Sequence, residues 1–199
     1  MNLIERVKNI LITPKTEWEV INNETATPAS LLTSYVIPMT LIGAIAAFIG
    51  YGLIGVNYFG FHVGGISWGI AQALKVFLSG IAGYFICTHV IDALAPSFGS
   101  EKNINKSAQL VAYANTAAWV AGIFQIFPAL AILGILGLYS IYLFWIGLPI
   151  MKKTPEDKNI GYVVIAAIVI IVISLILGFI ISKIMYTVLG NPYAGNTIF

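Results

Sequence analysis

Charged residues are scarce in this chain, and their scarcity decides the class of protein. Only 9% of the 199 residues are Asp, Glu, Lys or Arg, whereas 59% are hydrophobic and the mean hydropathy is +0.92. Soluble domains carry roughly a quarter charged residues. Because so few charges cannot cover a globular surface, the composition predicts an integral membrane protein. The net charge of +2 gives no basic field of the kind that binds nucleic acid.

Cysteine, histidine and catalytic motifs are also nearly absent. The lone Cys87 excludes an internal disulfide and a thiolate metal site, and His62 and His89 are too few for a zinc or iron centre. The sequence contains no G-x-x-x-x-G-K-[ST], H-E-x-x-H or G-x-S-x-G motif. We therefore expect neither an enzyme nor a cofactor. The N-terminus lacks a signal-peptide core and cleavage site, so we expect the first span to direct insertion.

Long apolar runs are what the sequence does contain. A helix needs about 20 apolar residues to cross the hydrocarbon core, and five segments reach that length, which predicts an all-α polytopic bundle. The third and fourth segments meet at Phe127-Pro128, where a proline favours a tight helical hairpin over one long buried helix. The five predicted spans cover about Leu31–Ile54, Trp68–Leu94, Ala108–Phe127, Ala129–Met151 and Gly161–Tyr186.

Lysine and arginine alternate between the connections of these spans. The N-terminal segment, the loop with Lys102 and Lys106 and the loop with Lys152, Lys153 and Lys158 are basic, whereas the first outer loop and the C-terminal tail have no Lys or Arg. Basic short loops stay in the cytoplasm. We therefore predict a multi-pass protein of the cell (inner) membrane, with a cytoplasmic N-terminus and an external C-terminus. Its regions are 1–30, with short amphipathic helices, the five-span domain 31–186 and the external tail 187–199.

The N-terminal region carries a helical apolar stripe that is interrupted at Thr13-Pro14. Pro14 suits the first turn of a second short helix, and Trp18 gives that helix an apolar side. The sequence allows two arrangements. The two helices lie on the cytoplasmic membrane face, with Pro14 and Trp18 as interface anchors, or they pack against the cytoplasmic end of the bundle.

The stretch CTHVIDALAP places two ionisable residues near the end of the second span. His89 and Asp92 are three residues apart, so they share a helix face. A carboxylate at a helix C-terminus opposes the helix dipole, so Asp92 needs a partner. His89 and the loop residues Lys106, Lys152 and Lys153 are the candidates. We expect a structural hydrogen-bonded cluster first and a partner-binding site second. A proton relay is not expected, because no second acid lies deeper in any span.

Small residues at four-residue spacing predict the helix faces that pack together in lipid. Such faces can pack against other helices of the same chain or against a second copy of the protein, so a homo-oligomer is also possible. The predicted packing residues are Ala114, Ala118 and Gly122 in the third span, with Asn115 beside them, and Ser174, Gly178 and Ser182 in the fifth.

Three stretches of the chain form a recognisable set. ILITPKTEWEVI has a proline closely followed by a tryptophan, HVIDALAPSFGSEKNINKSAQLVAYANTAAWVAGIF joins a histidine and an FG turn to a lysine-bearing segment, and PALAILGILGLYSIYLFWIGL forms a span. With the five-span layout, these stretches resemble the Yip family of Ypt/Rab-interacting membrane proteins, most closely its compact bacterial-type branch. The chain departs from the family at YANTAAW, where a proline often follows the YA pair.

The resemblance implies a membrane protein without catalytic residues. In eukaryotic members it also implies binding to Rab-type GTPases, but the polar N-terminal domain of those members is here reduced to about 30 residues, so that partner is not carried over. Our first hypothesis is a non-enzymatic scaffold or adaptor in membrane organisation or trafficking, with the lipid bilayer and a protein at the cytoplasmic face as partners. The alternative is a small-solute transporter or channel subunit that acts as an oligomer. An intramembrane enzyme that uses His89 and Asp92 is the third.

Overall fold

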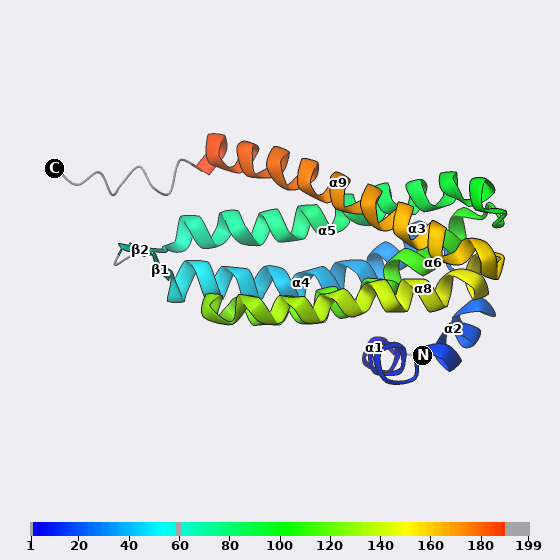
Figure 1. Cartoon of the computed structure of the whole chain (residues 1–199). Coiled ribbons are helices and arrows are strands. Elements are labelled where there is room, and N and C mark those ends of the chain that lie inside the picture. The colour runs from blue at the N-terminus through cyan, green and yellow to red at the C-terminus, as the bar shows by residue number, and fades with distance from the viewer. Residues whose placement is uncertain (1, 59–60, 190–199) are drawn as a thin grey trace.

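The computed structural model of the protein describes residues 2–58 and 61–189. Long helices lie side by side in one elongated bundle, with a short β-hairpin at one end and two short N-terminal helices beside the other end (Figure 1). The hairpin pairs β1 (Val56–Tyr58) with β2 (Phe61–Val63). In chain order the helical elements are α1 (Leu3–Ile12), α2 (Pro14–Asn22), α3 (Pro28–Leu31), η1 (Leu32–Val36), α4 (Ile37–Ala47), η2 (Phe48–Ile54), α5 (Ile66–Leu94), η3 (Ala95–Phe98), α6 (Ile104–Ala114), α7 (Thr116–Ala121), η4 (Gly122–Ile126), η5 (Pro128–Leu138), α8 (Tyr139–Lys152) and α9 (Glu156–Leu189).

Four helical stretches of the described chain are long and apolar enough to cross a membrane. They correspond to the first, second, fourth and fifth predicted spans, which confirms that the protein is helical and passes through the membrane several times. The first stretch begins before the predicted span, at Pro28, where the Thr27 side chain caps the helix. The four stretches are Pro28–Ile54, Ile66–Phe98, Ile132–Lys152 and Glu156–Met185.

The third predicted span is divided into three shorter elements, α6, α7 and η4. The α-helix is interrupted at Asn115, which caps the C-terminus of α6. The start of α6 and the end of η4 lie far apart along the bundle. Near the start, Lys106 donates hydrogen bonds to the main-chain carbonyls of Asn22, the last residue of α2, and of Glu24, whereas Gln125 near the end lies against Gly50 in η2.

The chain turns back at Phe127, where the backbone is extended (φ −116°, ψ 99°), and Pro128 begins η5. The segments before and after this turn pack against each other, with the backbone of Gly137 close to Ala118. The predicted helical hairpin is therefore confirmed, and the single long helix is not what forms.

Two glycine contacts set the distance between helices in the half of the bundle that ends at the hairpin. A Cβ built on Gly69 in α5 would lie 2.5 Å from the Cα of Gly52, and one built on Gly50 would lie 1.9 Å from the carbonyl oxygen of Gln125. Any side chain at these positions would force the backbones apart. Close backbone approach through glycine is the usual way in which membrane helices pack, since lipid gives no hydrophobic force between them.

The buried core lies toward the other end of the bundle, where the N-terminal helices pack. Trp18, Tyr84, Tyr162 and Leu143 are among its fully buried side chains. In contrast, the long helix α9 exposes isoleucine, valine, leucine and phenylalanine side chains along most of its length. An apolar exposed surface of this kind suits a helix that faces lipid.

Candidate functional site

The end of the bundle that carries α1 and α2 contains a buried cluster of polar groups around Lys152, the last residue of α8. Its ammonium group donates three hydrogen bonds: to Asp92 Oδ1 at 3.1 Å, to the Asn103 carbonyl oxygen at 3.2 Å and to Ser107 Oγ at 2.6 Å. The Ser107 hydroxyl in turn donates to Asp92 Oδ1 at 3.0 Å. Since an ammonium group has three N–H donors, every donor of Lys152 has an acceptor. We call these four residues the Lys152 cluster.

Burial and helix geometry explain why the Lys152 cluster needs to be complete. The side chain of Lys152 is fully buried and that of Asp92 is 10% exposed. Lys152 lies in the last turn of α8, where a cation interacts favourably with the helix dipole, whereas Asp92 lies near the end of α5, where a carboxylate does not. The ion pair and the Ser107 hydroxyl offset that unfavourable position of Asp92.

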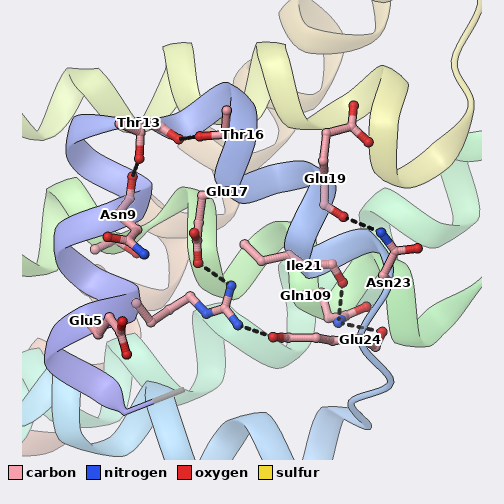
Figure 2. Close-up of polar contacts among 12 residues, drawn as sticks. Glu5, Asn9, Thr13, Thr16, Glu17, Glu19, Ile21, Asn23, Glu24 and Gln109 are labelled. Atoms are coloured by element: carbon pink, nitrogen blue, oxygen red, sulfur yellow. Dashed lines mark hydrogen bonds and ion pairs between the residues drawn. The ribbon is translucent and has the colours of Figure 1, made fainter.

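A second buried cluster fixes the N-terminal helices to each other (Figure 2). The guanidinium of Arg6 in α1 forms ion pairs with Glu17 in α2 and with Glu24 just beyond it. The same guanidinium lies 5.2 Å from the ring centre of Tyr113 in α6, the geometry of a cation–π contact. Arg6 thus holds α1, α2 and the bundle together, and we call Arg6, Glu17, Glu24 and Tyr113 the Arg6 cluster.

The end of α2 is held by side chains from α6. Gln109 Nε2 donates to the carbonyl oxygens of Ile21 at 3.3 Å and Glu24 at 3.2 Å (Figure 2). Lys106 Nζ donates to the carbonyl oxygens of Asn22 at 2.5 Å and Glu24 at 3.3 Å. Burial lowers the pKa of Lys106, and the nearby charge of Glu24 opposes this shift. These contacts supply partners to the carbonyl groups that a helix leaves unpaired at its C-terminus.

Trp18 lies inside the protein. Its side chain is fully buried, its Nε1 donates to the Leu143 carbonyl oxygen at 3.1 Å, and its ring lies against Gly147 of α8. Pro14, the first residue of α2, is also buried. The expectation that Pro14 and Trp18 anchor the helices in the membrane interface is therefore corrected: both side chains are buried, and Trp18 faces the bundle because Gly147 of α8 leaves space for its indole. Of the two predicted arrangements, the structure has the one in which these helices pack on the bundle.

Three of the residues predicted for the polar cluster lie apart from it. His89 is exposed and its Nδ1 lies 2.8 Å from the carbonyl oxygen of Phe85, so it is not the one of the candidate residues that pairs with Asp92. The rotation of α5 turns Asp92 toward α6 and α8 while His89 points outward. Lys153 pairs with Glu101 at 2.7 Å, with both side chains exposed. Lys106 belongs to the contacts at the end of α2, and only Lys152 reaches Asp92.

The predicted packing residues have different surroundings in the two segments. In the third segment Ala114 is buried, Gly122 lies against the backbone of Gly43, and Ala118 lies against Gly137. Asn115 uses its Nδ2 to donate to the Val111 carbonyl oxygen at 2.9 Å. In α9, Ser174 is exposed, Ser182 is half-buried, and no atom lies within 4 Å of a Cβ built on Gly178, so this face has free space beside it.

The Arg6 cluster was not predicted from the sequence, because Arg6 was counted as a basic residue on the polar side of the first helix and is in fact buried. One signal was present: Arg6 falls between Leu3 and Ile10 at spacings of three and four, so it belongs to the buried stripe of α1. Nothing in the sequence pairs it with Glu17 or Glu24. Among the described residues no three His, Cys, Asp or Glu side chains lie close enough together to hold a metal ion.

Comparison with known proteins gives one family and one kind of relative. The Yip1 domain model matches residues 8–191. The inner membrane protein YohC of Escherichia coli K12 is 25% identical over 155 residues, which cover 75% of this chain and 80% of YohC. YohC of Escherichia coli O6:H1 matches to the same extent. No solved structure matches the chain.

Proposed function

Because the chain belongs to the Yip1 domain family, we propose that it is a non-enzymatic scaffold or adaptor in membrane organisation or trafficking. It crosses the membrane five times, with the N-terminus in the cytoplasm and the C-terminus outside. Its contact surface is the outward face of α1 and α2 together with the neighbouring basic loops.

Support for a fifth crossing comes from the path of residues 104–126. The segment begins beside the end of α2, through Lys106, and ends beside η2, through Gln125. At roughly 1.5 Å per helical residue, a segment of this length covers the roughly 30 Å of a hydrocarbon core. The break at Asn115 leaves the N–H of Ala118 without a helical partner, and the Ser140 hydroxyl accepts from it at 3.0 Å. Side-chain capping of this kind lets a broken helix lie within a membrane.

Support for the orientation comes from the charges at the two ends. The lysines of the second and fourth loops and the arginine of α1 gather at the end that carries α1 and α2, through the contacts of Lys106, Lys152 and Arg6 described above. No Lys or Arg occurs in residues 55–65 at the opposite end. Positively charged loops favour the cytoplasm.

An aromatic ladder on α8 marks the cytoplasmic boundary of the hydrocarbon core. Tyr139, Tyr142 and Trp145 are 36–43% exposed and neighbouring rings are 5.3 Å and 6.1 Å apart. Exposed tyrosine and tryptophan concentrate at the level of lipid headgroups. Lys152 lies seven residues further along α8, which is roughly 10 Å at helical rise. The Lys152 cluster is then a structural element just outside the hydrocarbon core. At this position a charged Asp92 carboxylate is compatible with the membrane.

The single observation that carries the scaffold proposal is the way the Arg6 cluster fixes the N-terminal helices. With Arg6 and Trp18 turned inward, the outward face exposes Ile4 by 80%, Ile12 by 68% and Val20 by 46%. A rigid, amphipathic surface with exposed apolar side chains is the kind of surface that binds a partner or a membrane. The three isoleucine and valine side chains therefore mark the surface to test.

The position of α1 favours contact with the membrane interface. Figure 1 shows α1 end-on while the long helices run across the view, so α1 lies crosswise to the bundle. The Tyr139 hydroxyl donates to the Leu11 carbonyl oxygen at 3.2 Å, which places the end of α1 at the depth of the aromatic ladder. Ile4, Lys8 and Ile12 are four residues apart and share the exposed face. We assign this stripe to the headgroup region and the outer face of α2 to a protein partner.

The test is photo-crosslinking in cells from a probe at Val20, the exposed apolar residue of α2, followed by mass spectrometry. A probe at Leu175, which is 69% exposed on α9, serves as the control for random contacts in the membrane. We expect one recurrent protein from Val20 that Leu175 does not capture. Crosslinks from Val20 only to lipid or to copies of this chain would contradict the adaptor function and direct the next experiments to solute flux in proteoliposomes.

A further inference from the structure

A cavity of about 130 Å³ lies between α6, α8 and α9 and is partly open at the surface of the protein. Its lining is mostly apolar and includes Phe144, Val163 and Ala167. Two residues of the lining, Ile141 and Ile171, are 45% and 56% exposed, so the opening faces the apolar surroundings of the bundle. The volume is close to that of the engineered apolar cavity of roughly 150 Å³ that takes up benzene, so a short stretch of hydrocarbon fits.

Two polar side chains face this apolar cavity, Asn115 and Ser140. The Ser140 oxygen accepts from the Ala118 N–H at 3.0 Å, and its own proton has no acceptor among the described residues. Asn115 gives one Nδ2 hydrogen to the Val111 carbonyl oxygen at 2.9 Å. A primary amide has two such hydrogens, so one is left for another acceptor. The cavity thus offers two hydrogen-bond donors against an otherwise hydrocarbon-like wall.

The depth of the cavity narrows the choice of ligand. Ser140, Ile141 and Phe144 come from the same two turns of α8 as the aromatic ladder defined by Tyr139, Tyr142 and Trp145. That ladder lies at the boundary between headgroups and acyl chains. At this boundary a glycerolipid carries its ester carbonyls, which accept hydrogen bonds and are followed directly by methylene groups.

We propose that this cavity binds one glycerolipid of the surrounding bilayer. The first methylenes of an acyl chain lie against Phe144, Val163 and Ala167, and the adjoining ester carbonyl accepts hydrogen bonds from Ser140 and Asn115. In this arrangement the break in the third segment lies at the cavity, where Asn115 supplies one donor and Ser140 of α8 supplies the other. The proposal needs the membrane placement given above but not the scaffold function.

The test uses the full chain reconstituted in vesicles of phosphatidylethanolamine and phosphatidylglycerol. A small fraction of the phosphatidylethanolamine carries a photoreactive diazirine near the ester end of one chain, and crosslinked peptides are mapped by mass spectrometry. We expect labelling to concentrate on residues 140–144 and 163–171. Ala167→Phe, which fills the cavity, should lower that labelling several-fold. The control Val164→Phe adds a ring to a residue of α9 that is 49% exposed, and should leave the labelling unchanged.

Two further measurements keep the outcome decisive. Ala167→Leu fills less of the cavity and replaces Ala167→Phe if the larger variant does not give a monodisperse protein. An ether-linked photoreactive lipid lacks the ester carbonyl, and losing a neutral hydrogen bond should lower its labelling of the cavity by roughly threefold to tenfold. Labelling spread evenly over the exposed helix faces, or equal in the filled and control variants, would overturn the proposal. Equal labelling by ester and ether lipids would overturn the roles of Ser140 and Asn115.

Discussion

The buried ammonium group of Lys152 depends strongly on its neighbours for stability. Removing an ammonium group from water is costly, and the cost is recovered only where an opposite charge and complete hydrogen bonding replace the water. Asp92, Ser107 and the Asn103 carbonyl supply both. The adjacent Lys153 meets Glu101 at the surface, where solvent screens the pair. We therefore expect Lys152 to contribute much more than the neighbouring Lys153 to the stability of the fold.

This difference gives a prediction for single substitutions. Lys152→Met should lower the free energy of unfolding by about 3–5 kcal/mol, because it leaves Asp92 buried without its cation. Lys153→Met is the matched control and should change stability little. Thermal unfolding of both variants in detergent micelles measures the effect. Equal shifts for the two variants would mean that the Lys152 cluster does not stabilise the fold.

A second prediction distinguishes the ion pair from simple burial. The double variant Lys152→Met with Asp92→Asn should recover part of the stability that Lys152→Met loses, because no carboxylate is then left unpaired. Asp92→Asn alone should also be destabilising, because it leaves the fully buried Lys152 ammonium without its opposite charge. A double variant less stable than Lys152→Met alone would contradict this account.

At the scale of the element, α1 and α2 depend on Arg6. In Arg6→Met the carboxylates of Glu17 and Glu24 lose their shared cation, so we expect both helices to open from the bundle more often. Hydrogen–deuterium exchange should accelerate several-fold across residues 3–22 while the exchange of α5 stays the same. Lys8→Met, an exposed change in the same helix, should leave the exchange unaltered. Unchanged exchange in Arg6→Met would show that the other contacts, such as those of Trp18 and Gln109, hold these helices without Arg6.

Glycines of α5 provide the second prediction at this scale. Gly69→Ala should destabilise the protein by about 1–3 kcal/mol, because the new methyl group would meet the backbone of Gly52. Gly83 lies in the same helix with no atom within 4 Å of a built Cβ. Gly83→Ala should therefore be neutral or raise stability by up to about 1 kcal/mol through helix propensity. Thermal unfolding of both variants, compared directly, decides whether close packing or propensity governs these positions.

The elements also show how far sequence patterns reach. Length and hydropathy located four of the long helices, and Pro128 located the turn after the third segment. The break at Asn115 was not predictable, because it depends on Ser140 of α8 capping the N–H of Ala118 from a different segment. Helix spacing made His89 one of the candidate partners of Asp92, but α5 turns the two side chains toward different surroundings.

At the scale of the whole molecule, the number of crossings can be measured. In a Cys87→Ala background, single cysteines at Gly64, Lys102 and Asp157 are labelled with a membrane-impermeant maleimide in intact cells and in inside-out vesicles. Five crossings place Gly64 outside and both Lys102 and Asp157 inside. If residues 104–126 did not cross, Asp157 would be labelled from outside while Lys102 stayed inside.

Membership of the Yip1 domain family confirms the resemblance seen in the three sequence stretches and agrees with a multi-pass protein of the cell membrane. The three predicted regions and the roles of the site residues stay predictions. Most of the predicted external tail, residues 190–199, lies outside the described residues.

The sequence by itself determined that this is a membrane protein. Hydropathy and charge are sums over the residues of the chain, so they can be read without knowing which distant segments are in contact. The sequence also placed the long helices and the alternation of basic and neutral connections. Only the tertiary structure decided that Lys152 is the partner of Asp92, that Trp18 faces α8 and that Arg6 joins α1 to α2. Each of these depends on segments far apart in sequence meeting at a few ångströms, and several lysines and glutamates satisfied the sequence pattern equally well.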